Sequence, residues 1–198
     1  IAHDFDRVDP RQTKITLLEG QPRLLAMFPE RLAKKAAKDL ARLGVTVRTS
    51  AIVTKVDAEG VMLGDERINA GTVIWAAGVQ ASPVVRGLTG VEHDRAGRIK
   101  VNRDLSIPGH PDAYVVGDAA ATVDEKGKAY PGVAQVAAQQ GRWAAKNILR
   151  RLSGQSTEAF QYTDFGNMAT IGRNRAIADI RGIKLSGFPA WVAWAGLH

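Results

Sequence analysis

The chain has 198 residues, of which 45% are hydrophobic and 24% are charged, and this composition is typical of a soluble globular protein with one large or two small domains. No stretch approaches the roughly 18 uninterrupted apolar residues that a membrane-spanning helix needs. The sequence has no cysteine, so these residues exclude disulfides, iron–sulfur clusters, thiolate metal sites and dithiol catalysis.

The net charge of +7 is unevenly distributed along the chain. Residues 142–198 hold eight basic and three acidic side chains, so most of the positive excess lies in the C-terminal part. Such a region suits contact with anionic lipid or nucleic acid, and it equally suits an ordinary solvated surface. The four histidines show no ligand spacing, so we expect no metal site.

The first part of the chain predicts one helix among short strands. Residues 14–20 have the pattern of a buried strand that ends on an acid and a glycine, and a helix follows from Pro29 to Gly44. A β-branched and aromatic run at residues 72–78 predicts a central strand, with Trp75 packed in a core. The strands predicted between them are residues 45–47, 52–56, 61–63 and 67–68.

The second part predicts a loop-rich junction, a strand, a long helix and a hairpin. Residues 82–111 are rich in proline and glycine, and residues 113–118 predict a second buried strand. Pro131 opens the longest helical pattern. Its predicted apolar face consists of Val133, Val136, Ala137, Ala144, Ile148 and Leu152. The remaining predicted elements are a short strand at 99–101, a hairpin of residues 168–172 and 176–180, and an aromatic run at 188–194.

Two of the predicted strands end on an acid. Glu19 closes the first strand, and in doubly wound nucleotide-binding sheets an acid at such a place accepts hydrogen bonds from the adenosine ribose. Gly117 allows the close approach of a ligand, and Asp118 beside it can accept hydrogen bonds from a polyol chain, while backbone N–H groups bind phosphate. Ordinary turns use the same residues, so the two strand ends alone leave both interpretations open.

The order and spacing of four segments is more specific. They are Leu17-Leu18-Glu19, Val73-Ile74-Trp75-Ala76-Ala77-Gly78, Tyr114-Val115-Val116-Gly117-Asp118-Ala119-Ala120 and Pro131-Gly132-Val133-Ala134-Gln135-Val136-Ala137-Ala138-Gln139-Gln140-Gly141. Together they resemble the two-dinucleotide-domain flavoprotein reductases. Within these, they look most like the type II NADH dehydrogenases, the single-subunit respiratory NADH:quinone oxidoreductases. The resemblance covers nearly the whole chain.

The resemblance implies an α/β chain with part of an FAD/NAD(P)-binding, Rossmann-like fold and a small strand-rich C-terminal module. Residues 1–80 would be the later part of an NADH-binding domain, residues 81–153 the returning part of an FAD-binding domain, and residues 154–198 a truncated membrane-side module. Both glycine-rich phosphate turns of the family are missing from the sequence. We therefore expect a fragment of a longer protein that is inactive by itself.

The resemblance also implies sites for FAD and NADH. Gly117 and Asp118 would bind the ribityl-phosphate region of FAD. The helix start would direct free N–H groups and the positive end of its dipole at the flavin ring, where they favour the negative charge of the reduced form. The residues at that start are Gly132, Val133 and Ala134. Glu19 would bind the NADH ribose. The small residues that let the nicotinamide pass are Ala76, Ala77 and Gly78. The cofactors carry the chemistry, so we expect no catalytic side chain.

Quinone and membrane are the partners that the resemblance implies. Gln135 and Gln139 match family positions that line the quinone pocket, and an amide can donate to a quinone carbonyl without carrying charge; helix-surface glutamines are the alternative. Phe188, Trp191 and Trp194 suit a membrane interface, and they equally suit packing on the strand module. We expect the parent protein to be a peripheral enzyme on the cytoplasmic face of the inner membrane of a bacterium, and the fragment to be soluble. A homodimer is compatible with the resemblance, and we expect no nucleic acid partner.

Two other functions stay open. A related flavoprotein reductase acting on a ferredoxin, a sulfide or a disulfide would share most of these motifs, because catalytic thiols could lie outside this sequence. A basic lipid- or nucleic-acid-binding module would instead predict salt-sensitive binding by residues 142–198. No recognised nucleic-acid motif supports the second alternative.

Overall fold

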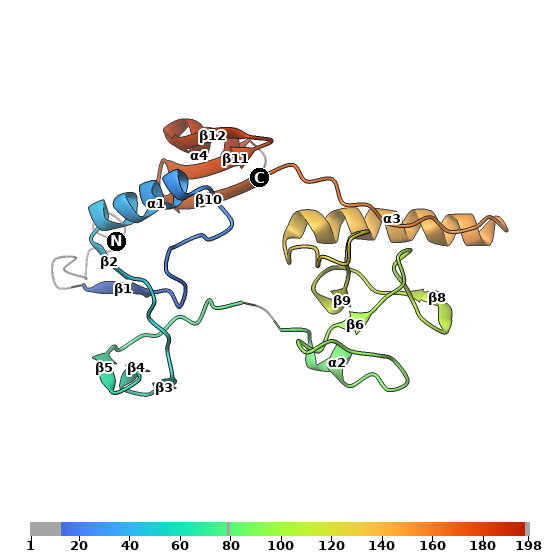
Figure 1. Ribbon diagram of the computed structural model, residues 1–198, viewed down its shortest axis with the longest axis horizontal. Coiled ribbons are helices and arrows are strands. Elements are labelled where there is room, and N and C mark those ends of the chain that lie inside the picture. The colour runs from blue at the N-terminus through green and yellow to red at the C-terminus, as the bar shows by residue number, and fades with distance from the viewer. Residues whose placement is uncertain (1–12, 79, 197–198) are drawn as a thin grey trace, which may run out of the picture. The chain divides into compact units, whose positions relative to one another are not determined.

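The computed structural model describes residues 13–78 and 80–196 (Figure 1). The chain forms two compact units, which we call unit 1 (residues 1–75 and 164–198) and unit 2 (residues 76–163). The first and last of the three predicted parts therefore fall largely within unit 1. The assignment of those parts to NADH, FAD and membrane contact stays a prediction.

The N-terminal half of unit 1 is a strand–helix–strand arrangement. β1 (Ile15–Leu18) and β2 (Val45–Arg48) pair in parallel, and α1 (Glu30–Arg42) connects them. The helix stops before Gly44, whose φ of +84° is a left-handed conformation that glycine adopts without a Cβ penalty. The predicted strand, helix and glycine stop are thus confirmed. The prediction that the strand is buried is wrong, because Ile15 and Leu17 of β1 are exposed.

A three-stranded antiparallel sheet forms the C-terminal part of unit 1. Its order is β10 (Asn167–Gly172), β11 (Arg175–Ile180) and β12 (Ile183–Gly187), and α4 (Phe188–Ala195) follows. β10 and β11 confirm the predicted hairpin. β12 is a third strand that the sequence pattern did not predict.

Side chains of β11 alternate between two helices. Ile177 packs with Leu32 and Ala36 of α1, while Ala176 and Ala178 form a second cluster that includes α4. Neighbouring residues of a strand point to opposite faces, so a single strand can contribute to both clusters. The helix pattern that buries Leu32 and Ala36 therefore also fixes the position of this sheet within unit 1.

Asp39 is a charged residue on the buried face of α1, with only 1% of its surface exposed. Lys35 forms an ion pair with its carboxylate from one turn before. Arg42 and Arg175 approach it to 3.7 and 3.8 Å. Since Arg175 belongs to β11, this acid links the helix to the sheet through charge.

A small meander follows β2. It consists of β3 (Lys55–Asp57), β4 (Gly60–Leu63) and β5 (Glu66–Asn69), which pair antiparallel in chain order. These strands confirm the predicted meander, although β3 begins later than the pattern predicted.

The strand predicted at residues 72–78 is wrong. This run has no strand conformation, and no strand in the described part of the chain pairs with it. Ile74 and Trp75 are 86% and 63% exposed, so Trp75 is not in a core either. A β-branched run becomes a strand only where a neighbouring strand supplies hydrogen-bond partners. The boundary between the two units falls directly after Trp75.

Unit 2 combines short strand pairs with one long helix. Its elements before the helix are α2 (Pro83–Arg86), β6 (Ile99–Lys100), β7 (Ser106–Ile107), β8 (His110–Tyr114), the 3₁₀ turn η1 (Gly117–Ala119) and β9 (Ala120–Ala121). β6 pairs with β9 in parallel, and β7 pairs with β8 antiparallel. The strand predicted at 113–118 is therefore only partly present. It cannot continue through Gly117, whose φ is +65°.

The long helix α3 (Ala134–Leu152) begins later than predicted, because Val133 has the extended φ and ψ of −130° and 151°. Its buried face differs from the predicted one. Leu152 is 80% exposed and Ile148 is also exposed. The buried residues are Val136, Gln140, Ala144 and Asn147, which recur at helical spacing.

An extended segment, residues 155–163, returns along α3 (Figure 1), and we call it the strap. Asn147 donates through Nδ2 to the carbonyl of Glu158 at 2.9 Å and accepts its N–H at 2.9 Å. Phe160 is buried with Leu105 and Ala144. The strap is therefore part of the core of unit 2, although its sequence predicted a linker over residues 153–157.

Candidate functional site

Several predicted cofactor residues line one hollow in unit 2. Its volume is about 300 Å³, at the lower end of the range for ligand pockets. The lining residues are Gly78, Arg98, Gly117, Asp118, Ala120, Thr122, Tyr130, Pro131, Gly132, Val133, Val136 and Ala137. Most are small or apolar, so a ligand can approach the backbone closely there.

Asp118 lies against the start of α3. A Cβ built on Gly132 would stand 3.6 Å from Oδ1 of Asp118, so the acid and the helix start are immediate neighbours. The side chain of Asp118 is exposed, and none of the described residues donates a hydrogen bond to its carboxylate. Both carboxylate oxygens are therefore available to the hydroxyl groups of a ligand.

The start of α3 supplies fewer free donors than the sequence predicted. The N–H of Val133 donates to the carbonyl of Pro131 at 3.0 Å, so it is not free. Ala134 is the first helical residue, and its N–H has no acceptor within the helix. The positive end of the helix dipole adds to this donor, so negative charge is favoured beside Ala134.

Gln140 is a residue of this region that the sequence analysis missed. It is completely buried, with an exposed fraction of 0%. Its Oε1 accepts the N–H of Gly117 at 2.6 Å, and its Nε2 donates to Oγ1 of Thr122 at 2.9 Å. The available signal was its spacing, since it stands four residues from Val136 and from Ala144 on one helix face.

The two glutamines predicted to line a quinone pocket have different surroundings. Gln139 donates to the carbonyl of Thr163 and accepts its N–H, both at 2.9 Å, so its amide holds the strap. Gln135 is exposed on the first turn of α3. The hydroxyl of Tyr162 donates to its Oε1 at 3.4 Å.

Aromatic rings form one wall of this region. Tyr130 lines the hollow and meets Phe160 and Tyr162 edge to face, with ring centroids 5.6 and 5.8 Å apart. Such pairs are more favourable than their buried area alone suggests. The strap, which carries two of the three rings, thereby supports the hollow.

Arg98 is the cation of the hollow and is held by Asp94. The guanidinium donates to Oδ2 of Asp94 through Nε at 2.7 Å, and the backbone N–H of Arg98 donates to Oδ1 at 2.9 Å. Partial burial acts to raise the pKa of Asp94, but these hydrogen bonds outweigh burial and lower it below its usual value. Asp94 therefore stays ionised at neutral pH and fixes the guanidinium.

The remaining predicted residues lie outside this hollow. Ala76 and Ala77 are exposed and precede Gly78. Glu19 is in unit 1, directly after β1, and its Oε1 accepts the N–H of Gln21 at 2.8 Å. The residue therefore stands at the carboxyl end of a parallel strand pair, where α/β sheets bind ligands.

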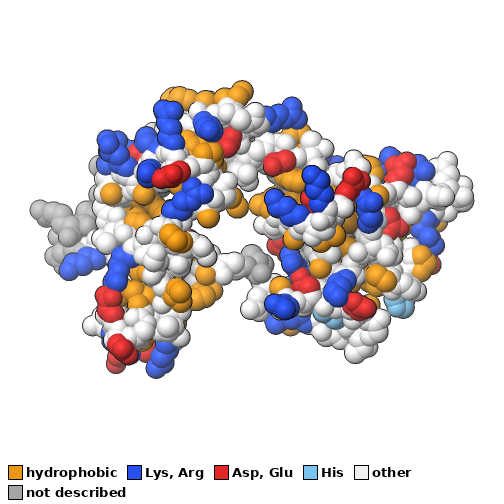
Figure 2. Space-filling model, viewed as in Figure 1, with side chains coloured by type: hydrophobic (Ala, Val, Ile, Leu, Met, Phe, Trp, Pro, Cys, Tyr) orange, Lys and Arg blue, Asp and Glu red, His pale blue; other side chains and the backbone are white. Residues whose placement is uncertain are grey.

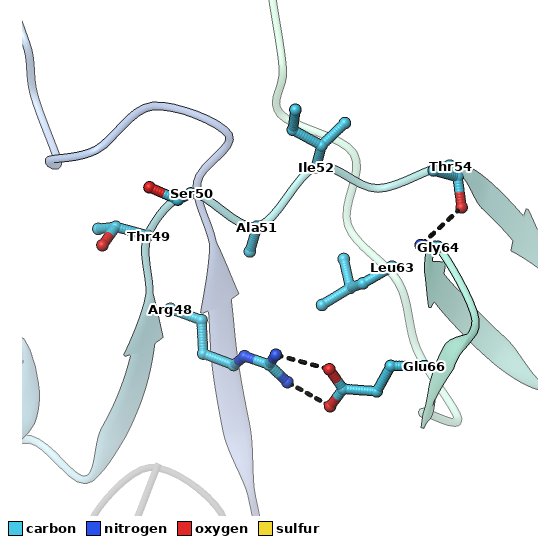
Figure 3. Close-up of a pocket in the computed structure, with 9 residues that line it drawn as sticks. All are labelled: Arg48, Thr49, Ser50, Ala51, Ile52, Thr54, Leu63, Gly64 and Glu66. Carbon is cyan, nitrogen blue, oxygen red and sulfur yellow. Dashed lines mark hydrogen bonds and ion pairs between the residues drawn. The ribbon is translucent and has the colours of Figure 1, made fainter.

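Unit 1 has a hollow of its own, with a volume of about 490 Å³ (Figure 3). Arg48 and Glu66 face each other across it, with two hydrogen bonds of 2.6 and 2.7 Å. Their charges compensate each other, and no predicted site residue lines this hollow. The hollow of unit 2, by contrast, is lined by several predicted site residues.

The hollow in unit 2 is suited to binding rather than to acid–base chemistry by side chains. Its ionisable groups are one carboxylate, one guanidinium and one phenol, with no nucleophile beside a base. No group of three His, Cys, Asp or Glu residues is placed to hold a metal within residues 13–78 and 80–196. Together, the α/β fold and this hollow are those of a chain suited to bind a small organic ligand.

The family of the chain follows from its sequence profile. Residues 3–141 match the pyridine nucleotide-disulphide oxidoreductase family. The chain therefore belongs to this family, and its mixed α/β fold agrees with the Rossmann-like fold that the sequence predicted.

Individual relatives are more specific. The type II NADH:quinone oxidoreductase Ndh of Mycobacterium tuberculosis is 40% identical over 98% of this chain, which spans 43% of that protein. The chain thus covers less than half the length of this curated relative. Its fold is similar to that of NDH2 from Plasmodium falciparum in complex with NADH, with a TM-score of 0.77 and 17% identity over 93% of this chain and 54% of the other.

A further structure with a similar fold is an FAD-dependent pyridine nucleotide-disulphide oxidoreductase from Desulfovibrio vulgaris. Its TM-score is 0.64 and its identity 22%, over 83% of this chain and 42% of the other. No helix among the described residues is long and apolar enough to cross a membrane.

Proposed function

We propose that this chain is part of a flavoprotein that transfers electrons from NADH, through FAD, to a quinone. The observation that carries the proposal is the exposed carboxylate of Asp118, which accepts no hydrogen bond from any described residue, beside the glycine-lined start of α3. The similarity to type II NADH:quinone oxidoreductases over nearly the whole chain supports the substrate pair. When bound, FAD supplies the chemistry, accepting a hydride from NADH and returning two electrons that, with two protons, reduce the quinone.

The residues of unit 2 fit a flavin. Asp118 would accept hydrogen bonds from the ribityl hydroxyls, and Gly132 leaves space next to it. The N–H of Ala134 and the dipole of α3 would favour the negative charge that the flavin ring gains on reduction. Gly117 contributes shape rather than a donor, because its N–H is already taken by Gln140.

NADH would contact two other segments. Glu19 would accept hydrogen bonds from the adenosine ribose with the carboxylate capacity that the turn to Gln21 leaves. The short side chains of Ala76 and Ala77 and the bare backbone of Gly78 would let the nicotinamide pass without a clash. A carboxylate at position 19 also disfavours a 2′-phosphate, so NADH is preferred to NADPH.

The quinone would lie next to Gln135 and Gln139. Gln139 would have to give up a bond to Thr163 before donating to a quinone carbonyl. Gln139 would instead shape the wall of the quinone site. The amides carry no charge, so they can polarise a carbonyl without the cost of burying an ion.

We further propose that the parent protein sits on the cytoplasmic face of a bacterial membrane through α4 and β12. Phe188 and Val192 are exposed on α4, and Ile183 is exposed on β12. Figure 2 shows hydrophobic side chains at the upper edge, where these two elements lie in Figure 1. Lys184 stands next to Ile183 and suits anionic headgroups. Co-sedimentation with anionic lipid vesicles should fall when Phe188 and Val192 are both changed to Ser; unchanged sedimentation would contradict this part of the proposal.

The flavin site is tested with Asp118→Ala in the protein expressed from its complete coding sequence. The wild-type protein should be yellow and should bleach when NADH is added. Loss of hydrogen bonds to a charged acceptor, at about 1.5–3 kcal/mol each, should weaken FAD binding by roughly 10-fold or more in calorimetric titration. The matched control is Asp112→Ala, an exposed acid of unit 2 outside the hollow. A wild-type protein without flavin absorbance would refute the proposed function.

The electron acceptor separates the proposal from its alternatives. Turnover of NADH should depend on a soluble quinone and should not be replaced by a ferredoxin, a sulfide or a disulfide. A basic binding module would instead bind nucleic acid or lipid and would not oxidise NADH. This binding would be lost when the salt concentration is raised.

A further inference from the structure

One side chain, that of Gln140, forms hydrogen bonds on either side of the turn that carries Asp118. Gly117 begins this turn, and Thr122 lies just beyond β9, so the two residues bracket the segment that contains Asp118. Gln140 bonds to both of them, through Oε1 at 2.6 Å and through Nε2 at 2.9 Å. One amide of α3 therefore fixes both ends of the acid-bearing segment.

The burial of Gln140 makes this arrangement specific. Its exposed fraction is 0%, and it does not line the hollow, whereas Gly117, Thr122 and Val136 around it do. A buried amide that loses its partners carries the full cost of desolvation, so Gln140 tolerates few other positions of the turn. The N–H of Gly117 is a donor only, which also fixes the orientation of the amide.

Close packing reinforces the hydrogen bonds. A Cβ on Gly117 would stand 3.2 Å from the Cβ of Ala137, one helical turn before Gln140, so the turn already touches α3 at this point. The distance between Asp118 and the helix start at Gly132 thus depends on how the turn rests on the helix. Both residues take part in the flavin contact described above.

We propose that Gln140 is a positioning residue that sets the place of the Asp118 carboxylate relative to the start of α3, and thereby the affinity for the flavin. The inference rests on the proposed function only for the identity of the ligand. The positioning itself concerns residues 117–122 and can be measured without any cofactor.

The chain offers a matched control in Asn147. It lies seven residues further on the same face of α3, is also 0% exposed, and also bonds through its amide to backbone groups. Its partners, Asp104 and Glu158, are not part of the segment of residues 117–122. Asn147→Leu should therefore cost stability in the same way as Gln140→Leu while leaving the turn in place.

The experiment compares Gln140→Leu, Gln140→Glu and Asn147→Leu in the full-length protein. Hydrogen exchange of the apo forms should show faster exchange at the N–H of Gly117, by about 10-fold or more, only in Gln140→Leu, because that bond is lost. Calorimetric titration should show a Kd for FAD raised by about 10-fold or more in Gln140→Leu and within about 3-fold of wild type in Asn147→Leu.

Gln140→Glu provides the rescue, because a carboxyl group retains the acceptor for Gly117 and the hydroxyl of Thr122 can turn to donate to it. It should recover most of the exchange protection and FAD affinity, and it remains the decisive variant if Gln140→Leu does not fold. Equal FAD affinity in Gln140→Leu and Asn147→Leu, or unprotected Gly117 in Gln140→Glu, would overturn the proposal. A wild-type protein that binds no flavin would refute the proposed function instead, and the exchange result would still decide whether Gln140 positions the turn.

Discussion

Gly117 combines two constraints, a left-handed backbone conformation and close contact with a neighbouring helix. Its φ of +65° is a conformation that other residues adopt at a cost, and its position leaves only 3.2 Å between an added Cβ and the Cβ of Ala137. The sequence predicted the glycine as a point of ligand approach. The structure adds that α3 itself approaches there.

Gly117→Ala separates these two constraints when it is compared with Gly127→Ala. Gly127 has a φ of +77° with nothing within 4 Å, so its substitution measures the backbone cost alone. Both changes should lower the free energy of unfolding by roughly 1 kcal/mol or more. Gly117→Ala should cost more than Gly127→Ala in urea unfolding, and only Gly117→Ala should weaken FAD binding. Equal effects of the two variants would show that contact with Ala137 is unimportant.

At the scale of whole elements, regular periodicity predicted the type of an element. The sequence did not predict which neighbours an element would pack or pair with. The helix pattern from Pro29 and the alternation in residues 168–180 both gave elements of the predicted type, because their buried partners lie in the same unit. The run at 72–78 has equally strong β propensity and forms no strand. Propensity describes what a segment can form, whereas the pairing partner decides whether it forms.

At the candidate site, too, the sequence predicted some residues and missed others. Motif order predicted Gly117, Asp118 and Gly132 as neighbours, and they line one hollow. Gln140 and Asn147 escaped prediction because a polar residue on a helix is ordinarily placed on the surface. Their burial is explained by hydrogen-bond partners at both ends of each amide. These partners are backbone groups around Asn147, and the Gly117 N–H and the Thr122 hydroxyl around Gln140, and they come from distant segments.

Asp39 determines how firmly α1 holds the sheet of unit 1. Its Oδ1 and the Nη1 of Arg175 are both buried without a hydrogen bond among the described residues, so the group already carries a desolvation cost. Asp39→Asn keeps the shape and removes the charge opposite Lys35 and Arg175. We expect a loss of about 1–3 kcal/mol in the free energy of unfolding.

The control for Asp39 is the exposed pair of Glu30 and Lys34 on the same helix, which is also spaced by four residues. Lys34→Ala should change stability by less than about 1 kcal/mol, because exposed ion pairs contribute little. Thermal unfolding of the two variants gives the comparison. An Asp39→Asn protein as stable as wild type would mean that the attraction between Asp39 and its cations is cancelled by the cost of desolvating the carboxylate.

At the scale of the whole molecule, the chain is organised as two units. The polypeptide leaves unit 1 after residue 75, forms unit 2, and returns to unit 1 at residue 164. Unit 1 is held by the contacts of α1 and α4 with one sheet, and unit 2 by α3, the strap and the strands between them. Relatives with more than twice this length contain further chain, which is where the proposal expects the two glycine-rich phosphate turns.

Acid should weaken unit 2 through Asp104. Partial burial acts to raise the pKa of this carboxyl, but hydrogen bonds from Ser106 and Thr157 outweigh burial and lower the pKa below its usual value. The stabilisation is therefore complete above the unfolded-state pKa of about 3.9 and is lost as pH falls through the folded-state pKa. Since Thr157 belongs to the strap, loss of this bond loosens the strap.

Urea unfolding at neutral pH and at about pH 4 and 3 measures this effect. The wild-type protein should lose stability towards the acid end, and Asp104→Asn should be less stable at neutral pH with a shallower decline. Asp112→Asn is the control, because its ion pair with Arg151 is open to solvent. The same decline in Asp104→Asn and in wild type would assign the acid sensitivity to other carboxyl groups.

The strap also gives unit 2 an optical reporter. The chain has four tryptophans, and Trp143 is the one that falls within residues 76–163. Its indole N–H donates to the carbonyl of Glu158 at 2.9 Å, and the ammonium of Lys146 stands 4.9 Å from its ring centre. Emission from this indole therefore depends on the strap lying against α3. When the strap leaves, water should reach the indole and shift its emission to longer wavelengths, so detachment becomes visible in real time without any added label.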